Sequence, residues 1–431
     1  MVKFCSFPAL LLASGAAMTM SPHVAMAKRI GTIAPYRIVS AARIPEAPAH
    51  LRAKWQAYLE NSAKHAVHDK QALAAETVAG VPIPPSPADG NGLATMPLDR
   101  DAAWYRTSSA LEVADTIMSF QTPSGGWGKN MPRNVAPRLP GQHYVHDASP
   151  AAGKRSWDFV GTIDNGATTT ELSFLARVVE AGDAATAARY GKAIARGIEY
   201  LLAAQMPNGG WPQVWPLAGG YHDALTYNDD AMVRVMGILL AAAEGQGGFA
   251  SLPAHLREKS RQAVADGITC LLDTQIVHKG QRTGWAQQYD ALTLVPDSAR
   301  NYEPVALASS ESSKILLFLM AIPKPSADVQ AAVREGVGWL QRVAITDRIW
   351  DRAGGDPQLV VSKGARLLWA RFYSIPDNTP VFGDRDRALY DDVRDISPER
   401  RRGYSWYNST PASALASYDI WQKRIARGEG K

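Results

Sequence analysis

The chain has 431 residues, of which 46% are hydrophobic and 20% charged, and this is the composition of a globular protein with one large domain or two smaller ones. The net charge of +5 permits an acidic partner without demanding one, and we expect neither nucleic acid nor a membrane as a partner. No stretch approaches the ~20 apolar residues that a membrane-spanning helix needs.

Residues 1–27 have the pattern of a secretory signal peptide. Lys3 supplies the positive end, the stretch PALLLASGAAM supplies a short apolar core, and an A-x-A cleavage site ends at Ala27. We therefore expect a secreted or periplasmic protein. Cleavage removes Cys5 and leaves only Cys270, so we expect no internal disulfide in the mature chain.

Residues 28–97 are interpreted as an N-terminal extension. It contains one helical stretch, from about Pro48 to Ala79, and then a Pro/Gly-rich linker at 80–92, GVPIPPSPADGNG. The regular part of the chain, residues 98–427, follows this linker.

In this regular part a unit recurs, in which a helix ends in Gln, a Gly-Trp loop follows, and a second helix comes next. Three copies place Gln and Trp at 121 and 127, 205 and 211, and 275 and 285. The stretch VGWLQRVAITDRIW, which ends at Trp350, is interpreted as a worn fourth copy. The first helices are expected at about 104–120, 186–204, 258–275 and 326–343, and the second helices at about 167–180, 229–244, 309–322 and 410–425.

Helices joined in this way pack as antiparallel hairpins, and a closed stack of such hairpins is an all-α toroid with outer and inner helices. All inner helices then run in one direction, so their N-termini and the Gly-Trp loops gather at one rim. A structural role is expected for each loop Trp, which seals the end of its hairpin.

A carboxylate and a carboxamide precede the first inner helix, in the stretch GTIDNGATTTEL. Thr168 and Glu171 form a T-x-x-E capping box, so the helix does not need Asp164 and Asn165 as its cap. The alternative is that the Asp-Asn-Gly sequence is an ordinary turn.

The second loop ends in Asn228, Asp229 and Asp230, and the third carries Arg300. Asn228 is also a suitable N-cap, and the two aspartates suit the positive end of a helix dipole. Convergence of these side chains on one rim favours a binding site, because carboxylate and amide oxygens are the ligands that calcium prefers.

The long fourth loop, 344–407, contains the stretch SPERRRGYSWY. Its run Arg400–Arg402 follows Glu399, and a solvated face of mixed charge explains it equally well. Arginines that face an acidic substrate are the other interpretation, because the guanidinium group binds carboxylates.

The stretches QTPSGGWGKN, IDNGATTTEL, QMPNGGWPQVWPL, YNDDAM, PDSARNYEP, FYSIPDNTPVFGDRD and ERRRGYSWY occur in this order. Together they resemble the signature blocks of family 10 polysaccharide lyases, which are pectate lyases with an (α/α)3 toroid. The resemblance covers about Leu98 to Trp421, so it implies that residues 98–427 are a catalytic (α/α)3 toroid with long loops on one rim. We expect a monomer.

The resemblance implies β-elimination on polygalacturonate, assisted by Ca2+, with 4,5-unsaturated oligogalacturonides as products. It implies that Arg300 abstracts the C5 proton. The metal ligands that it implies, besides the substrate carboxylate, are Asp164, Asn165 and a member of the pair Asp229 and Asp230. The substrate contacts that it implies are Asp164, Lys129, Arg385 and an arginine of the run that includes Arg400 and Arg401.

Three residues depart from the family pattern. Gly128 stands where a proline is expected, and Asn301 and Pro304 vary the block after Arg300. These changes affect loop shape more than chemistry. Arginine is normally fully protonated, so a base needs desolvation or positive neighbours that disfavour its cation. We therefore predict an alkaline pH optimum.

Three other functions are alternatives to a lyase. An inverting glycoside hydrolase on the same architecture would release saturated sugars. An isoprenoid cyclase would use the DDVRD stretch at 391–395 to bind a diphosphate through magnesium, but this stretch lies in a loop. A non-catalytic pectin-binding protein would bind the polymer without turnover.

Overall fold

The computed structural model describes residues 28–146 and 160–428. The predicted signal peptide, residues 1–27, lies outside the described residues. In the described residues no helix is both long enough and apolar enough for a membrane span.

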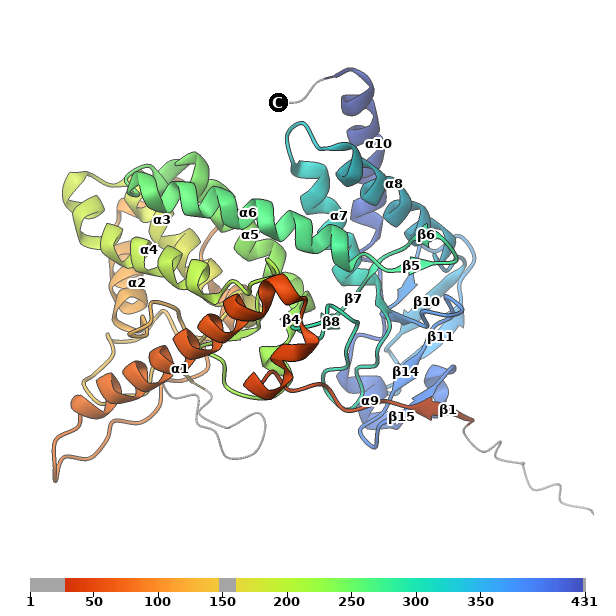
Figure 1. Cartoon of the computed structure of the whole chain (residues 1–431), viewed down its shortest axis with the longest axis horizontal. Coiled ribbons are helices and arrows are strands. Elements are labelled where there is room, and N and C mark those ends of the chain that lie inside the picture. The colour runs from red at the N-terminus through yellow and green to blue at the C-terminus, as the bar shows by residue number, and fades with distance from the viewer. Residues whose placement is uncertain (1–27, 147–159, 429–431) are drawn as a thin grey trace, which may run out of the picture.

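The protein is an all-α toroid of helical hairpins, as predicted (Figure 1). The outer helices are α2 (Ser108–Ser119), α4 (Ala184–Ala204), α6 (Ala254–Thr274) and α8 (Ala327–Arg342), and the inner helices are α3 (Thr169–Ala181), α5 (Ala231–Glu244), α7 (Ser309–Ala321) and α10 (Ala412–Ala426). Helix α3 packs on α4, α5 on α6 and α7 on α8, while α10 packs on both α7 and α8. The inner helices are also neighbours, because α5 contacts both α3 and α7.

Among the described residues, two further α-helices lie outside the hairpins: α1 (Arg52–Ala75) and α9 (Pro398–Gly403). The strands are short and lie mostly in the loops. They are β1 (Arg29–Thr32), β2 (Gly161–Thr162), β3 (Val214–Trp215), β4 (Leu225–Thr226), β5 (Val277–His278), β6 (Gln281–Arg282), β7 (Trp285–Ala286), β8 (Gln288–Tyr289), β9 (Leu307–Ala308), β10 (Arg348–Asp351), β11 (Gln358–Val361), β12 (Trp369–Ala370), β13 (Phe372–Tyr373), β14 (Phe382–Gly383), β15 (Ala388–Tyr390) and β16 (Tyr407–Asn408).

The same hydrogen bonds close each hairpin. The Trp indole N–H donates to a carbonyl in the last turn of the preceding outer helix. The pairs are Trp127 with Ile117, Trp211 with Leu201 and Trp285 with Leu271, at 2.7, 2.8 and 2.7 Å. The Gln side chains at 121, 205 and 275 each donate to one carbonyl of their own loop and to one carbonyl of the next outer helix. The predicted structural role of these tryptophans is thus explained by buried hydrogen bonds.

The fourth hairpin has the same indole hydrogen bond, but its donor is not the tryptophan assigned from the sequence. Its donor is Trp369, whose indole N–H lies 2.8 Å from the carbonyl oxygen of Leu340. Trp350, which the sequence analysis assigned to this copy, lies instead in the antiparallel hairpin of β10 and β11. That hairpin is inserted between the fourth outer helix and its Trp, and so it shifts the expected spacing.

Short antiparallel pairs join each loop to the next. Strand β2 of the first loop pairs with β3 of the second, and β4 of the second pairs with β8 of the third. Strand β9, just before α7, pairs with β7 and with β13 of the fourth loop. These pairs fix the loops relative to one another, so residues from four loops meet at one rim.

The N-terminal extension, called the arm from here on, is residues 28–97. Strand β1 pairs with β15, and α1 contacts the end of α4 and the first two loops, at Ala204, Ser124 and Leu217 (Figure 1). The predicted helix is present as α1, whereas β1 was not predicted. Trp55 of α1 is fully buried, and the hydroxyl of Tyr58 donates to the carbonyl oxygen of Ala204 at the end of α4, at 3.0 Å.

Candidate active site

Two acidic turns of similar shape precede the first two inner helices. The first is η5 (Asp164–Gly166) before α3, and the second is η7 (Asn228–Asp230) before α5, and the two turns contact each other. Asn165, Asp229 and Asp230 have φ values of 51, 53 and 62°. Asn and Asp tolerate this left-handed region better than other residues with a Cβ, which explains their presence in these turns.

The predicted capping box at the start of α3 is wrong. Thr168 has φ 62° and its side chain makes no cap hydrogen bond to the helix. Its hydroxyl instead donates to the carbonyl oxygen of Thr162 at 2.8 Å and accepts from the backbone N–H of Trp127 at 3.0 Å. Glu171 forms a buried ion pair with Arg133. Both residues therefore tie the first loop to α3.

Lys129 lies against the first acidic turn. Its ammonium nitrogen is 2.6 Å from Oδ2 of Asp164, whose Oδ1 accepts from the backbone N–H of Asn165 at 2.9 Å. The Asn165 amide donates to Oδ1 of Asn130 at 3.3 Å, which leaves its own Oδ1 as an acceptor. The predicted substrate contact Lys129 is thus placed beside the predicted metal ligands.

The two aspartates of the second turn have different surroundings. Burial raises the pKa of Asp229, and the negative charge of Asp164 raises it further. Asp230 instead lies 3.5 Å from the cationic groups of both Arg234 and Lys314. Asp229 is therefore the aspartate that feels the negative charge of the first turn, whereas Asp230 is paired with cations.

Two pockets of about 530 and 360 Å3 adjoin at these turns. Both are lined by Asp229 and Arg371, and together they are called the cleft. The larger pocket extends over Asn165 and Asp230 toward α7. The smaller pocket has Arg300, Arg352 and Arg402 in its lining. The larger pocket thus combines carboxylates with cations, among them Asp230, Arg234 and Lys314, whereas the smaller pocket is strongly basic.

Arg300 forms a two-point ion pair with Glu303. Its Nε and Nη2 lie 2.9 and 2.5 Å from the two carboxylate oxygens, and the Tyr404 hydroxyl donates to the same carboxylate at 2.7 Å. Burial disfavours the Arg300 cation, but the hydrogen bonds and charge of Glu303 outweigh this effect and raise the pKa of Arg300 above its usual range. In this arrangement Arg300 is a cation.

Arg371 was not singled out in the sequence analysis, although it lines both pockets. Its guanidinium group donates to Glu311 at 2.8 Å and to the side-chain oxygen of Asn228 at 3.3 Å. It is the second residue after Trp369, as Lys129 is the second after Trp127. This spacing is the signal that identifies Arg371 once the fourth Trp is assigned correctly.

The other predicted arginines lie outside the lining of the cleft. Arg385 is exposed and pairs with Glu399 at 2.9 Å, and Arg400 is buried and pairs with the same carboxylate at 2.5 Å. Arg401 pairs with Asp356 at 2.8 Å. Of the run at 400–402, Arg402 lines the pocket that contains Arg300.

The described residues contain no group of three or more His, Cys, Asp or Glu side chains that is placed to hold a metal ion. The donors present are oxygens of Asp164, Asn165 and Asp229. Calcium takes 6–8 oxygen ligands, so these residues fit it as part of a set that substrate and water complete. The negative charge of Asp164 raises the pKa of Asp229, and Asp164 already attracts one cation, the Lys129 ammonium group at 2.6 Å.

Comparison with known proteins agrees with this architecture. A family model described as pectic acid lyase matches residues 121–415. A family 10 polysaccharide lyase from Cellvibrio cellulosa is 31% identical, with a TM-score of 0.64, over 77% of this chain and 99% of that structure.

An aspartate-to-alanine mutant of that lyase, in complex with trigalacturonic acid, is 32% identical, with a TM-score of 0.64, over 77% of this chain and 98% of that structure. Curated protein sequences gave no significant match. The chain belongs to the pectic acid lyase family and is a family 10 polysaccharide lyase.

Proposed function

We propose that this lyase cleaves polygalacturonate by calcium-assisted β-elimination and releases 4,5-unsaturated oligogalacturonides. The observation that carries the proposal is the cleft, in which Asp229 lies next to the first acidic turn and four arginines line the smaller pocket. A polymer with one carboxylate on each sugar matches the arginines, and a cation matches the aspartates. The similar structure that holds trigalacturonic acid supports the same substrate class.

The residues that would hold Ca2+ are Asp164, Asn165 and Asp229. Asp229 is preferred to Asp230 because the negative charge of Asp164 acts on it, whereas Asp230 is paired with Arg234 and Lys314. When bound there with the C6 carboxylate of the substrate, the ion would stabilise the negative charge that develops as the C5 proton leaves.

The basic part of the cleft would hold further substrate charge. Arg371 is fixed by Glu311 and Asn228, so its guanidinium group is oriented before substrate binds. Arg402 and Arg352 line the same pocket as Arg300. Arg300 would take the C5 proton, a double bond would form between C4 and C5, and the bond from C4 to O4 would break, with O4 protonated by solvent.

A base role for Arg300 requires the neutral guanidine, whereas the ion pair with Glu303 favours the cation. Three neighbouring arginines act in the opposite direction once substrate excludes water. We therefore expect the rate at saturating calcium to rise on the alkaline side of neutrality. A rate maximum below pH 7 would contradict the assignment of Arg300 as base.

The test is to incubate the protein with polygalacturonate, with calcium or with a chelator, and to follow the ultraviolet absorbance of the 4,5-unsaturated product. We expect a calcium-dependent rise that Asp164→Ala abolishes. Asp115→Ala is the matched control, because Asp115 pairs with Arg189 on the outer surface. New reducing ends without ultraviolet absorbance would indicate a hydrolase instead. Binding without turnover in the unaltered protein would indicate a pectin-binding protein.

We also propose that the mature protein is exported to the periplasm or the medium and acts as a monomer. N-terminal sequencing of the exported protein is expected to begin near Lys28, and sedimentation is expected to give the mass of one chain. Retention of residues 1–27 would contradict export by this signal.

A further inference from the structure

One wall of the cleft comes from the arm. Asn91, Leu93 and Ala94 are exposed, and all three line the larger pocket together with Asn165 and Asp229. These three residues of the arm are called the wall residues below. The family model begins only at residue 121, so the wall residues precede the region that defines the family.

The chain segment that carries the wall residues is held tightly on the first loop. The backbone N–H of Gly90 donates to the carbonyl oxygen of Asn130 at 2.7 Å. A Cβ on Gly90 would lie 2.4 Å from the carbonyl oxygen of Met131, and one on Gly92 would lie 2.6 Å from Oδ1 of Asn130. The turn η3 (Gly92–Thr95) also contacts η5, which carries Asn165. Two glycines thus allow a close approach that larger residues would prevent.

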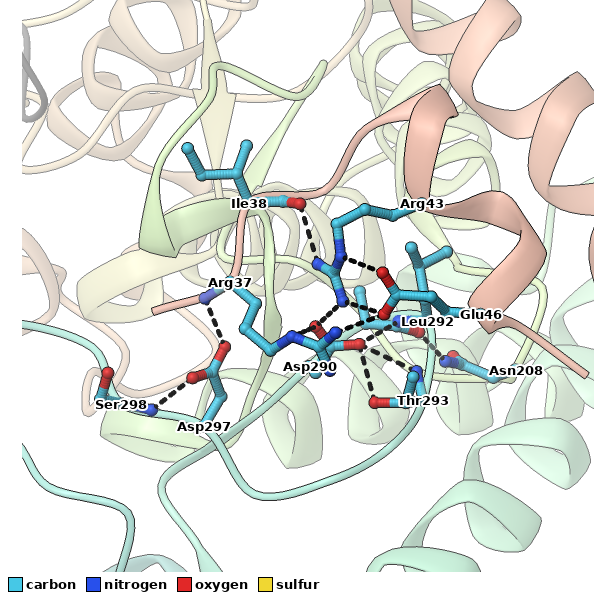
Figure 2. Close-up of polar contacts among 11 residues, drawn as sticks. Arg37, Ile38, Arg43, Glu46, Asn208, Asp290, Leu292, Thr293, Asp297 and Ser298 are labelled. Atoms are coloured by element: carbon cyan, nitrogen blue, oxygen red, sulfur yellow. Dashed lines mark hydrogen bonds and ion pairs between the residues drawn. The ribbon is translucent and has the colours of Figure 1, made fainter. Parts of the chain in front are cut away.

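The rest of the arm is anchored on the loop that carries Arg300. Arg43 pairs with Asp290 at 2.5 Å, and the backbone N–H of Arg37 donates to Asp297 at 2.8 Å (Figure 2). Asp290 also accepts from the backbone N–H of Thr293, at 2.9 Å, so one carboxylate holds both the arm and the loop. Anchored near both acidic turns and near Arg300, the arm is a fixed part of the rim.

The wall residues bring an apolar contact to an otherwise charged pocket. Leu93 is 36% exposed, and the cationic side chains of Arg234 and Lys314 line the same pocket. A galacturonate residue has an apolar C–H face and an anionic carboxylate, so it matches a pocket that has both an aliphatic side chain and two cations.

We propose that the arm forms a sugar-binding subsite of this lyase, in which Leu93 packs on the C–H face of a galacturonate residue beyond the site of cleavage. This proposal rests on the proposed substrate. The arm then sets how the enzyme ranks substrates of different length, because only an oligosaccharide long enough to reach Leu93 gains the contact.

The test compares Leu93→Ala with Ile83→Ala on galacturonate oligomers of increasing length. Ile83 is an exposed aliphatic residue of the same arm, at 59% exposure, and it lines neither pocket of the cleft. For Leu93→Ala we expect KM to rise roughly three- to tenfold for the longer oligomers, with kcat unchanged. For the shortest substrate that is cleaved, and for Ile83→Ala at every length, we expect no change.

A rise in KM for Leu93→Ala that is equal for oligomers of all lengths, or no rise at any length, would refute the proposed subsite. Thermal unfolding of both variants separates a folding defect from a binding defect. If the unaltered protein makes no unsaturated product, the proposed function fails, but calorimetric titration with the longest oligomer still tests the subsite. Equal affinities of Leu93→Ala and Ile83→Ala in that titration would refute it.

Discussion

Glu303→Gln removes the negative charge that Arg300 pairs with and keeps the shape of the side chain. Burial alone would raise the pKa of Glu303, but the hydrogen bonds and charge of Arg300 lower it from 4.5 to about 2. This difference corresponds to about 3 kcal/mol of folding free energy at pH 7. The free-energy scale is taken from the carboxylate of Glu303, which is 2% exposed, and not from the Arg300 side chain, which is 41% exposed.

The sign of the pH dependence follows from the lowered pKa. The stabilisation is fully present above pH 4.5 and is lost as the pH falls through 2, because the folded carboxylate must then take up a proton. We expect the free energies of unfolding of the unaltered protein and Glu303→Gln to differ by about 3 kcal/mol at pH 7 and by about 2 kcal/mol at pH 3.5.

Urea denaturation at the two pH values measures this difference. Glu399→Gln is the control, because Glu399 also pairs with arginines but is exposed, and we expect a much smaller effect. A difference for Glu303→Gln that is equal at pH 7 and pH 3.5 would show that packing, and not charge, is responsible, and would refute the argument.

Two further variants test the supports of the cleft. Arg371→Met leaves Glu311 buried without its cation, so we expect the free energy of unfolding to fall by about 3–5 kcal/mol and KM to rise. Denaturation and steady-state kinetics measure the two effects. A change in stability with KM unchanged would contradict a substrate contact. Arg43→Gln weakens the contact of the arm with Asp290, so we expect the free energy of unfolding to fall by about 1–3 kcal/mol and kcat to be lower. An unchanged kcat would show that the arm does not position the loop that carries Arg300.

The helical repeat was predictable from the sequence because the same hydrogen bonds recur in each hairpin. The Trp indole satisfies a carbonyl that a helix end would otherwise leave unpaired, and the Gln side chain joins its own loop to the next outer helix, so both residues recur at fixed places. The inner and outer helices accordingly begin and end close to the predicted positions.

The start of α3 shows where local reasoning failed. Thr168 and Glu171 have the spacing of a capping box, yet both side chains bond to other parts of the first loop. The pattern is local, whereas Trp127 and Arg133 come into contact with α3 only in the folded chain. A buried arginine and a backbone N–H compete for these side chains, and the capping bond is lost.

The contacts of the arm with the rim could not be predicted from the sequence either. Its contacts to the loop that carries Arg300 join residues separated by about 250 positions, such as Arg43 and Asp290, and a single sequence offers no signal for such pairs. The exposed linker at 80–92 has the composition of a surface loop. Glycines in such a loop are expected to be flexible, but here Gly90 and Gly92 allow close approach to Met131 and Asn130.

Arg371 was missed because the tryptophan of the fourth repeat was assigned wrongly. The second residues after the four hairpin tryptophans are Lys129, Gln213, Gln287 and Arg371. Trp369, and not Trp350, makes the fourth indole bond, and only this assignment puts Arg371 in the series. Each hairpin therefore presents one side chain at an equivalent point of the rim, and Arg371 contacts the Gln287 side chain of the neighbouring repeat at 3.5 Å. Two of the four equivalent positions, Lys129 and Arg371, carry a cation, and Arg371 is the one of the two that lines the cleft.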